Sequence, residues 1–198
     1  MNIRISIGAT LLIGAICITP HSQANLSEDA NLTRCAELEL RVAGLFRVGT
    51  ALLYLDQCED AKRILEPVPK KFSLELARSF SGEDLIETAR STLKKNLALD
   101  DADQLPDPLR CMADAYVDAG DGDRYDVIFK PGEGLRMYLN GDLLRQCDAD
   151  EGAEKYFMIW FGDQPFHRRM RDRLIEEAIR NGSDASRQSS DRAARTHV

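Results

Sequence analysis

Histidine is scarce in this chain of 198 residues, and the motifs of the common enzyme classes are absent. His21 and His197 lie near the ends, which leaves His167 for any histidine-based metal site or catalytic triad. His167 precedes Arg168 and Arg169, and we interpret it as part of a solvated helix face. The sequence has no GxSxG, no P-loop, no GxGxxG and no CxxC. Hydrolase, kinase, dehydrogenase and thioredoxin-like functions therefore have no support, and we expect no metal and no cofactor.

Basic residues are in the minority, with 26 Lys and Arg against 33 Asp and Glu. The formal net charge is −7, and the sequence shows no basic stripe. Neutralisation of nucleic-acid phosphates needs clustered Lys and Arg side chains. We therefore expect no nucleic-acid partner.

Only the N-terminus has a long apolar run, over residues 5–18, and it follows the positive charge of Arg4. Small residues precede a cleavage position after Ala24. This pattern predicts a secretory signal peptide over residues 1–24 and a periplasmic or secreted protein. The alternative is an uncleaved anchor helix, although the run is shorter than the ~20 apolar residues that span a bilayer. After cleavage we expect no transmembrane segment.

Four cysteines remain after removal of this signal, and an even number in an exported protein indicates disulfides. Three connectivities are open. We favour a Cys35–Cys58 pair, because these residues bracket an apolar, strand-like segment. Cys111 would then pair with Cys147. The alternative is four buried free thiols.

The first half of the mature chain alternates between strand and helix signals. After a polar lead-in at 25–34, residues 38–55 are β-like and apolar on both faces from Val48 onward. Residues 56–63 favour a short helix or loop. Residues 71–80 alternate strictly, which places Arg78 as the lone charge on an apolar face. Ser81 then caps a predicted amphipathic helix.

The second half begins with a helix predicted at 109–117 and continues into a β-meander from Asp123. Asn140 and Gly141 are a strong signal for a type I′ hairpin turn. A capping box of Asp148 and Glu151 predicts one buried helix that ends before Gly162.

A final amphipathic helix is predicted to begin at Pro165 and to end at Gly182. The polar tail, residues 182–198, is predicted to be disordered, so the domain spans 35–181.

Four segments in this order resemble the bacterial chalcone-isomerase-like proteins, exported relatives of plant chalcone isomerase and of its fatty-acid-binding homologues. They are LFRVGTALLYLDQC, KKFSLELARSFSGEDL, GDRYDVIFKPGEGLRMYLNG and AEKYFMIWFGDQPF. The resemblance covers residues 35–176. It implies an α+β fold, an open-faced β-sandwich in which helices cover one face of an antiparallel sheet and a ligand cleft lies between them.

The resemblance also implies an arginine in the ligand site, and Arg41 is the best match. The alternative is that Arg41 is a surface strand residue paired with Glu37 or Glu39. Arg47 and Arg78 are the other candidates, and for Arg78 the alternative is a structural salt bridge to a helix. A guanidinium can stabilise an enolate or bind a carboxylate.

Three polar groups of the plant enzymes have no counterpart in this chain. The family threonine falls on Gly49, with Thr50 one place off. The plant enzymes have a tyrosine early in the helix after the strand, and Leu85 stands at that position here. They have a hydroxyl residue near the end of the buried helix, where this chain has Ile159. Tyr54, Tyr116 and Tyr138 could supply a phenolic partner. A cleft with an arginine and apolar walls fits an amphipathic acid better than a polyphenol.

The favoured function is therefore an exported, non-catalytic binder of a small hydrophobic or amphipathic ligand such as a fatty acid. One alternative is an isomerase of the intramolecular lyase type acting on an enone-like substrate. Another is a cell-envelope interaction module with an occluded cleft.

Overall fold

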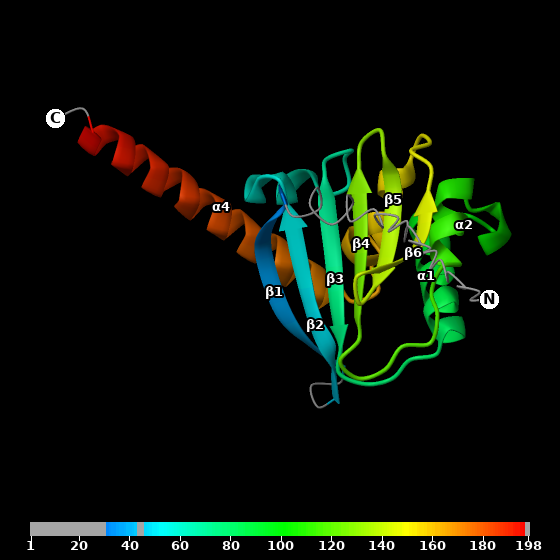
Figure 1. Ribbon diagram of the computed structural model, residues 1–198. Helices are drawn as coiled ribbons and strands as arrows, with labels where there is room; N and C mark the ends of the chain where they lie inside the picture. The colour runs from blue at the N-terminus through cyan, green and yellow to red at the C-terminus, as the bar shows by residue number, and fades with distance from the viewer. Residues whose placement is uncertain (1–30, 43–45, 197–198) are drawn as a thin grey trace, which may run out of the picture. The chain divides into compact units, whose positions relative to one another are not determined.

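A six-stranded antiparallel sheet is the centre of the fold (Figure 1). The computed structural model describes residues 31–42 and 46–196, so the predicted signal peptide lies outside the described residues. The strands, which pair in sequence order, are β1 (Thr33–Val42), β2 (Phe46–Leu55), β3 (Lys70–Leu76), β4 (Arg124–Lys130), β5 (Gly134–Leu139) and β6 (Asp142–Cys147). The α-helices are α1 (Gly82–Asn96), α2 (Asp107–Ala113), α3 (Met158–Phe161) and α4 (Arg168–Thr196). The 3₁₀ helices are η2 (Cys58–Arg63), η3 (Ala102–Gln104) and η4 (Ala153–Phe157).

Alternation along the strands gives the sheet two chemically different faces. On the core face, which packs against the helices, one row of paired side chains consists of Leu53, Phe72, Val127 and Met137. On the opposite, polar face one row consists of Glu39, Thr50, Glu75 and Arg124. The predicted α+β class and open-faced antiparallel sheet are confirmed.

The turn between β5 and β6 lies at Asn140 and Gly141, as predicted. Their φ angles are 54° and 90°, which are the positive values that a type I′ turn needs. The Asn140 side chain accepts a hydrogen bond from the backbone N–H of Arg124 at 2.9 Å and donates one to Asp123 at 2.8 Å. The turn residue therefore also fixes the start of β4.

Helix α1 begins where the sequence predicts. The Ser81 hydroxyl accepts a hydrogen bond from the backbone N–H of Asp84 at 3.1 Å. Ala89 and Leu93 are buried, and Leu85 packs against the core. This apolar stripe holds α1 against the core face.

The segment before Gly162 differs from the single capped helix that the sequence predicts. It consists of η4 followed by the short α3. Gly152 stands at the N-cap with a φ of 89°, and no side chain caps this end. The predicted capping box of Asp148 and Glu151 is wrong, because the helical segment begins at Ala153 and its N-cap, Gly152, has no side chain to accept a hydrogen bond.

The predicted burial of this segment is confirmed. Its buried side chains, each at most 6% exposed, are Tyr156, Phe157, Ile159, Trp160 and Phe161. The Trp160 ring stacks on Phe72 of β3, with 4.2 Å between ring centres. Aromatic packing therefore joins α3 to the core face.

Helix α2 ends at Ala113 rather than at the predicted Val117. The Tyr125 hydroxyl of β4 donates to the carbonyl of Val117 at 2.6 Å and accepts from its N–H at 3.2 Å. The Tyr125 side chain thus bonds to the N–H and C=O groups of Val117, which a longer α2 would use for its own hydrogen bonds.

The last helix also differs from its prediction, which is a start at Pro165 and an end at Gly182 before a disordered tail. It begins at Arg168 and continues to Thr196. Gly182 lies so close to η2 that a Cβ there would be 2.7 Å from Glu59 Cδ. This glycine permits a close contact and does not end the helix.

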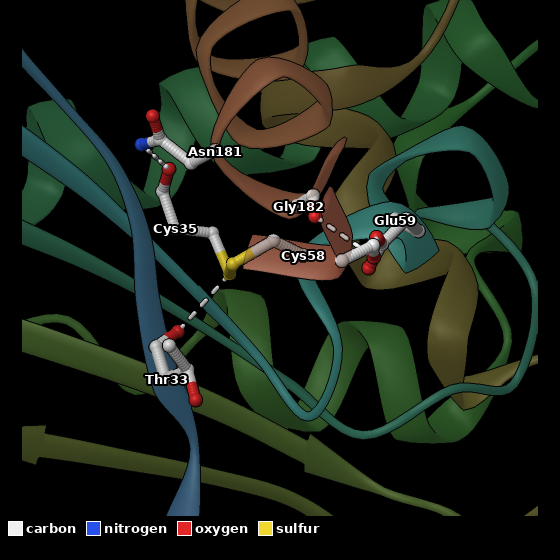
Figure 2. Close-up of a disulfide and its surroundings, with 7 residues drawn as sticks. Thr33, Cys35, Cys58, Glu59, Asn181 and Gly182 are labelled. Atoms are coloured by element: carbon white, nitrogen blue, oxygen red, sulfur yellow. Dashed lines mark hydrogen bonds between the residues drawn. A yellow bond between two sulfur atoms is a disulfide. The ribbon is translucent and has the colours of Figure 1, made fainter. Parts of the chain in front are cut away.

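Two disulfides join separate elements with the favoured connectivity, Cys35–Cys58 and Cys111–Cys147. The first connects β1 to η2 beside α4 (Figure 2). There the side chain of Asn181 donates to the carbonyl of Cys35 at 2.9 Å, and Ser186 donates to Glu59 at 2.7 Å. The hydrogen bond to Ser186 lowers the pKa of Glu59. The middle of α4, from Asn181 to Ser186, therefore packs on a disulfide-bonded corner.

Replacing both cysteines of this corner by serine is expected to lower the free energy of unfolding by about 3 kcal/mol, because the unfolded chain regains the freedom of a closed loop. Urea denaturation measures this loss. Tryptic cleavage after Arg187 is also expected to become faster.

The matched control is the Cys111→Ser/Cys147→Ser variant, which should lose comparable stability without faster cleavage after Arg187. Equal cleavage rates in the two variants would show that the Cys35–Cys58 bond does not hold α4.

Candidate functional site

A groove of about 650 Å³ runs along the free edge of β1, between this strand and α4. This volume is in the usual range of small-molecule sites. The strand contributes residues 38–41. The remaining lining side chains are His167, Arg169, Arg173, Glu176, Glu177 and Arg180. Leu38 is partly exposed and provides apolar surface, whereas Leu40 is 1% exposed and belongs to the core. The groove therefore combines a small apolar surface with four arginines and three glutamates.

Arg41 lies in this groove, and its electrostatic partner is Glu39. The Arg41 Nε to Glu39 Oε1 distance is 2.5 Å, and Arg47 Nε lies 3.3 Å from the second oxygen of the same carboxylate. The side chains of Arg41 and Glu39 are 50% and 44% exposed. An ion pair this exposed contributes only about 0–1 kcal/mol. Arg41 can therefore exchange Glu39 for a ligand carboxylate at little cost, while Arg47 remains beside Glu39.

Thr50 and Arg78 lie near this edge of the sheet but outside the groove lining. Thr50 is half-buried on the polar face, where it pairs with Glu39 across β1 and β2. Arg78 follows the end of β3 and is exposed, with its guanidinium carbon 5.3 Å from the centre of the Phe80 ring. Among the described residues Arg78 has no ion-pair partner, so the structure does not contain the salt bridge considered as its alternative.

Leu85 and Ile159 lie in the helical layer, on the other side of the sheet from Thr50. Leu85 is in the first turn of α1, whereas Ile159 belongs to α3. Met158, next to Ile159, contacts the far end of α1 through Asn96. The two side chains are therefore separated by much of the length of α1. The structure does not bring the five predicted ligand residues into one cleft.

A buried lysine is the feature that the sequence pattern missed. Lys70 opens β3 on the core face and is 0% exposed. Its ammonium donates to the carbonyls of Ile64 and Glu66, both at 2.6 Å. The ammonium also lies 5.1 Å and 5.2 Å from the ring centres of Phe129 and Phe157. Burial lowers the pKa of Lys70 to about 7. The strict alternation of β3, extended back by one residue, would have placed Lys70 on this face.

Of the candidate phenolic groups, Tyr116 is held in its neutral form. The Tyr156 hydroxyl is 3.3 Å from that of Tyr116, and burial raises the pKa of both well above the ordinary value. Tyr54 lies beneath the ammonium of Lys71, 4.0 Å from its ring centre. Neither Tyr116 nor Tyr156 therefore offers a phenolate for chemistry.

His167 is a helix cap, which differs from the predicted solvated face. Its Nδ1 accepts a hydrogen bond from the backbone N–H of Met170 at 3.0 Å. Within the part of the chain that the structure describes, no three histidine, cysteine, aspartate or glutamate side chains could hold a metal ion.

The open-faced sheet with helices on one face defines the class of protein, and comparison with known proteins gives its family. The sequence profile of the family described as chalcone isomerase-like matches residues 36–176, and the chain therefore belongs to this family. Among solved structures it is similar to a fatty-acid binding protein of Arabidopsis thaliana, with a TM-score of 0.55 and 15% identity. The match covers 77% of this chain and 90% of the plant chain, and it concerns the fold. None of the curated proteins matches the chain.

In residues 31–42 and 46–196, none of the helices has both the length and the apolar character needed to cross a lipid bilayer.

The buried position of Lys70 predicts a distinct pH dependence of stability. Its pKa is about 7 in the folded state and 10.5 in the ordinary state, so between these values the unfolded chain binds more protons. The free energy of unfolding is therefore expected to increase by about 2 kcal/mol from pH 7 to pH 9. Chemical denaturation at pH 7 and at pH 9 measures the free energy of unfolding.

The Lys70→Met variant should lose this increase, while the neighbouring Lys71→Met, on the polar face, should retain it. The same pH slope in wild type and Lys70→Met would mean that Lys70 is not the titrating group.

Proposed function

We propose that this protein is a non-catalytic binder of a small amphipathic acid such as a fatty acid, and that the groove beside Arg41 is its site. The observation that carries the proposal is the juxtaposition in that groove of the partly exposed Leu38 with an exchangeable guanidinium. An acyl chain would lie along Leu38 and the aliphatic stems of the arginines. Its carboxylate would replace Glu39 on Arg41. The plant structural neighbour is a fatty-acid binding protein, which supports the same ligand class.

The charge distribution favours binding over the family's isomerase chemistry. Cyclisation of a phenolic enone requires charge stabilisation of an enolate in a site that excludes water. Arg41 is half-exposed at a sheet edge. Leu85 and Ile159 replace groups that could hydrogen-bond the substrate, and they lie away from Arg41. An isomerase acting on an enone-type substrate is the less supported alternative.

Export is part of the proposal and is supported by the two disulfides. Disulfides form and persist in oxidising compartments such as the periplasm or the extracellular space. Both pairs join separate elements of the domain. A cleaved signal over residues 1–24 would deliver the chain to such a compartment.

Ligand binding is tested with purified, delipidated protein and dodecanoate. Native mass spectrometry of the undelipidated protein should show bound fatty acid, and added dodecanoate should raise the melting temperature. Arg41→Ala is expected to weaken dodecanoate binding about tenfold, because a charge-assisted hydrogen bond to the carboxylate is lost.

The control is Arg47→Ala, which removes a second cation from Glu39 but does not alter the groove lining. It should change the affinity less than about threefold. Absence of bound lipid together with an unchanged melting temperature would overturn the binder proposal. An equal loss of dodecanoate affinity in Arg41→Ala and Arg47→Ala would show that the groove is not the binding site.

Export is tested by the intact mass of the protein recovered from its host. The expected mature chain begins at Asn25, and reduction should raise its mass by four hydrogen atoms. A chain that retains residues 1–24, or one whose mass does not change on reduction, would contradict export with two disulfides.

A further inference from the structure

Three arginines from neighbouring strands meet in one row at one end of the sheet. Arg41 and Arg47 are partners in the register of β1 and β2. The N–H of Ala77 donates to the carbonyl of Val48 at 2.9 Å, which continues the pairing of β2 with the chain beyond β3. In this continued register Arg78 falls opposite Arg47. Figure 1 shows the end of β1, the start of β2 and the end of β3 together at the lower edge of the sheet.

Negative charge does not balance this row. The carboxylate of Glu39 is shared by the first two arginines. In the part of the chain that the structure describes, Arg78 has no ion-pair partner. Glu75, farther along β3, lies beside Arg124. Like charges at opposed strand positions destabilise a sheet, so an anionic partner would relieve a repulsion that the fold itself leaves uncompensated.

Phe46 is an independent observation at the same place. It begins β2 directly before Arg47, and at 63% its side chain is the most exposed of the large apolar residues that the structure describes. A second ring, Phe80, lies under the guanidinium of Arg78, with 5.3 Å between the guanidinium carbon and the ring centre. A single exposed apolar side chain is ordinary in a soluble protein. An exposed ring beside uncompensated cations has the chemistry of a membrane interface, where aromatic rings lie at the headgroup level and arginines meet phosphates.

We propose that this end of the sheet, with Arg41, Phe46, Arg47 and Arg78, is a docking surface for an anionic phospholipid bilayer. The guanidinium groups would bind lipid phosphates through charge-assisted hydrogen bonds. The Phe46 ring would enter the boundary between headgroups and acyl chains. The formal net charge of the whole chain is −7, so the attraction is local and orients the molecule with this end toward the lipid. A soluble polyanion would satisfy the arginines and leave Phe46 in water.

This surface adjoins the groove through Arg41, which belongs to both. A docked molecule would therefore present the Arg41 end of the groove to a bilayer, where amphipathic acids partition. The docking proposal does not depend on the fatty-acid proposal, because Phe46, Arg47 and Arg78 lie outside the groove lining.

The test is co-sedimentation of the full chain, as recovered from its host, with two kinds of vesicle. One kind is phosphatidylcholine alone, and the other is an equimolar mixture of phosphatidylcholine and phosphatidylglycerol. Binding to phosphatidylcholine alone is expected to be at least about tenfold weaker than binding to the mixture. Binding to the mixture should be lost in about 1 M salt, which screens charges beyond ~3 Å. All variants share one N-terminus, so any lipid binding by the apolar run at 5–18 is common to them.

Arg78→Ala and Phe46→Ser are the diagnostic variants. Arg78→Ala is expected to lower the partition coefficient on mixed vesicles about fivefold, because one cation is removed from the surface. Phe46→Ser should lower it about tenfold, because the apolar insertion is lost. Both variants should bind dodecanoate as the wild type does, which separates this surface from the fatty-acid groove.

The matched controls lie on β6, at the opposite edge of the sheet. Arg145→Ala removes an exposed arginine that also has no ion-pair partner among the described residues. Leu143→Ser removes an apolar side chain that is 49% exposed. Both controls should retain the wild-type affinity for mixed vesicles.

Three results would overturn the proposal. The first is no binding to mixed vesicles, and the second is binding that does not depend on phosphatidylglycerol. The third is that each diagnostic variant loses no more affinity than its control on β6. Heparin serves as the probe for a soluble polyanion: heparin binding that is weakened by Arg78→Ala but not by Phe46→Ser, without vesicle binding, would assign the arginine row to such a polyanion instead.

Discussion

The hydrogen bonds of Asn96 are the constraint on which the position of α4, and with it the groove beside Arg41, depends. This side chain, at the end of α1, bonds to Gln164 in the segment before α4 and to the carbonyl of Met158 in α3. Gly162 passes so close that a Cβ would lie 2.2 Å from the Asn96 Oδ1 atom. A larger residue at 162 would separate α1 from α3 and displace the start of α4. The glycine that ends the aromatic family segment is therefore required by a contact, in addition to its role as a helix end.

Helix α4 transmits this constraint to the groove at the edge of the sheet. Its first turn is positioned by the Asn96 hydrogen bonds, and farther along Asn181 bonds to the carbonyl of Cys35 in β1. The side chains that line the groove lie between these two attachments. A wall held at both ends needs little rearrangement when a ligand binds, which lowers the entropic cost of binding. The disulfide at Cys35 thus stabilises the site as well as the domain.

Much of the fold could be predicted because its signals are local. Asn140 and Gly141 specify their turn by backbone preference alone, and strand alternation separated the two faces of the sheet. The failures involve contacts between distant segments. Gly182 resembles a helix terminator until Glu59 is known to lie against it. Lys70 resembles a surface lysine until the carbonyls of Ile64 and Glu66 are placed around its ammonium. For the same reason a family resemblance gave the types of the site residues but not the face of the sheet on which each one lies.

The contrast between Lys70 and Arg41 shows how this fold divides its cations between stability and function. Lys70 is fully buried, and the protein carbonyls of Ile64 and Glu66 take two of its three N–H donors, so a ligand from solvent does not reach it. Arg41 shares one carboxylate with Arg47 at an exposed edge, so it can change partner at little cost. Stabilising a transition state would require the reverse, a fixed charge shielded from water. An exchangeable cation at an exposed edge is better suited to reversible binding of an acid, and this distribution of charge is the strongest physical support for the proposed binding function.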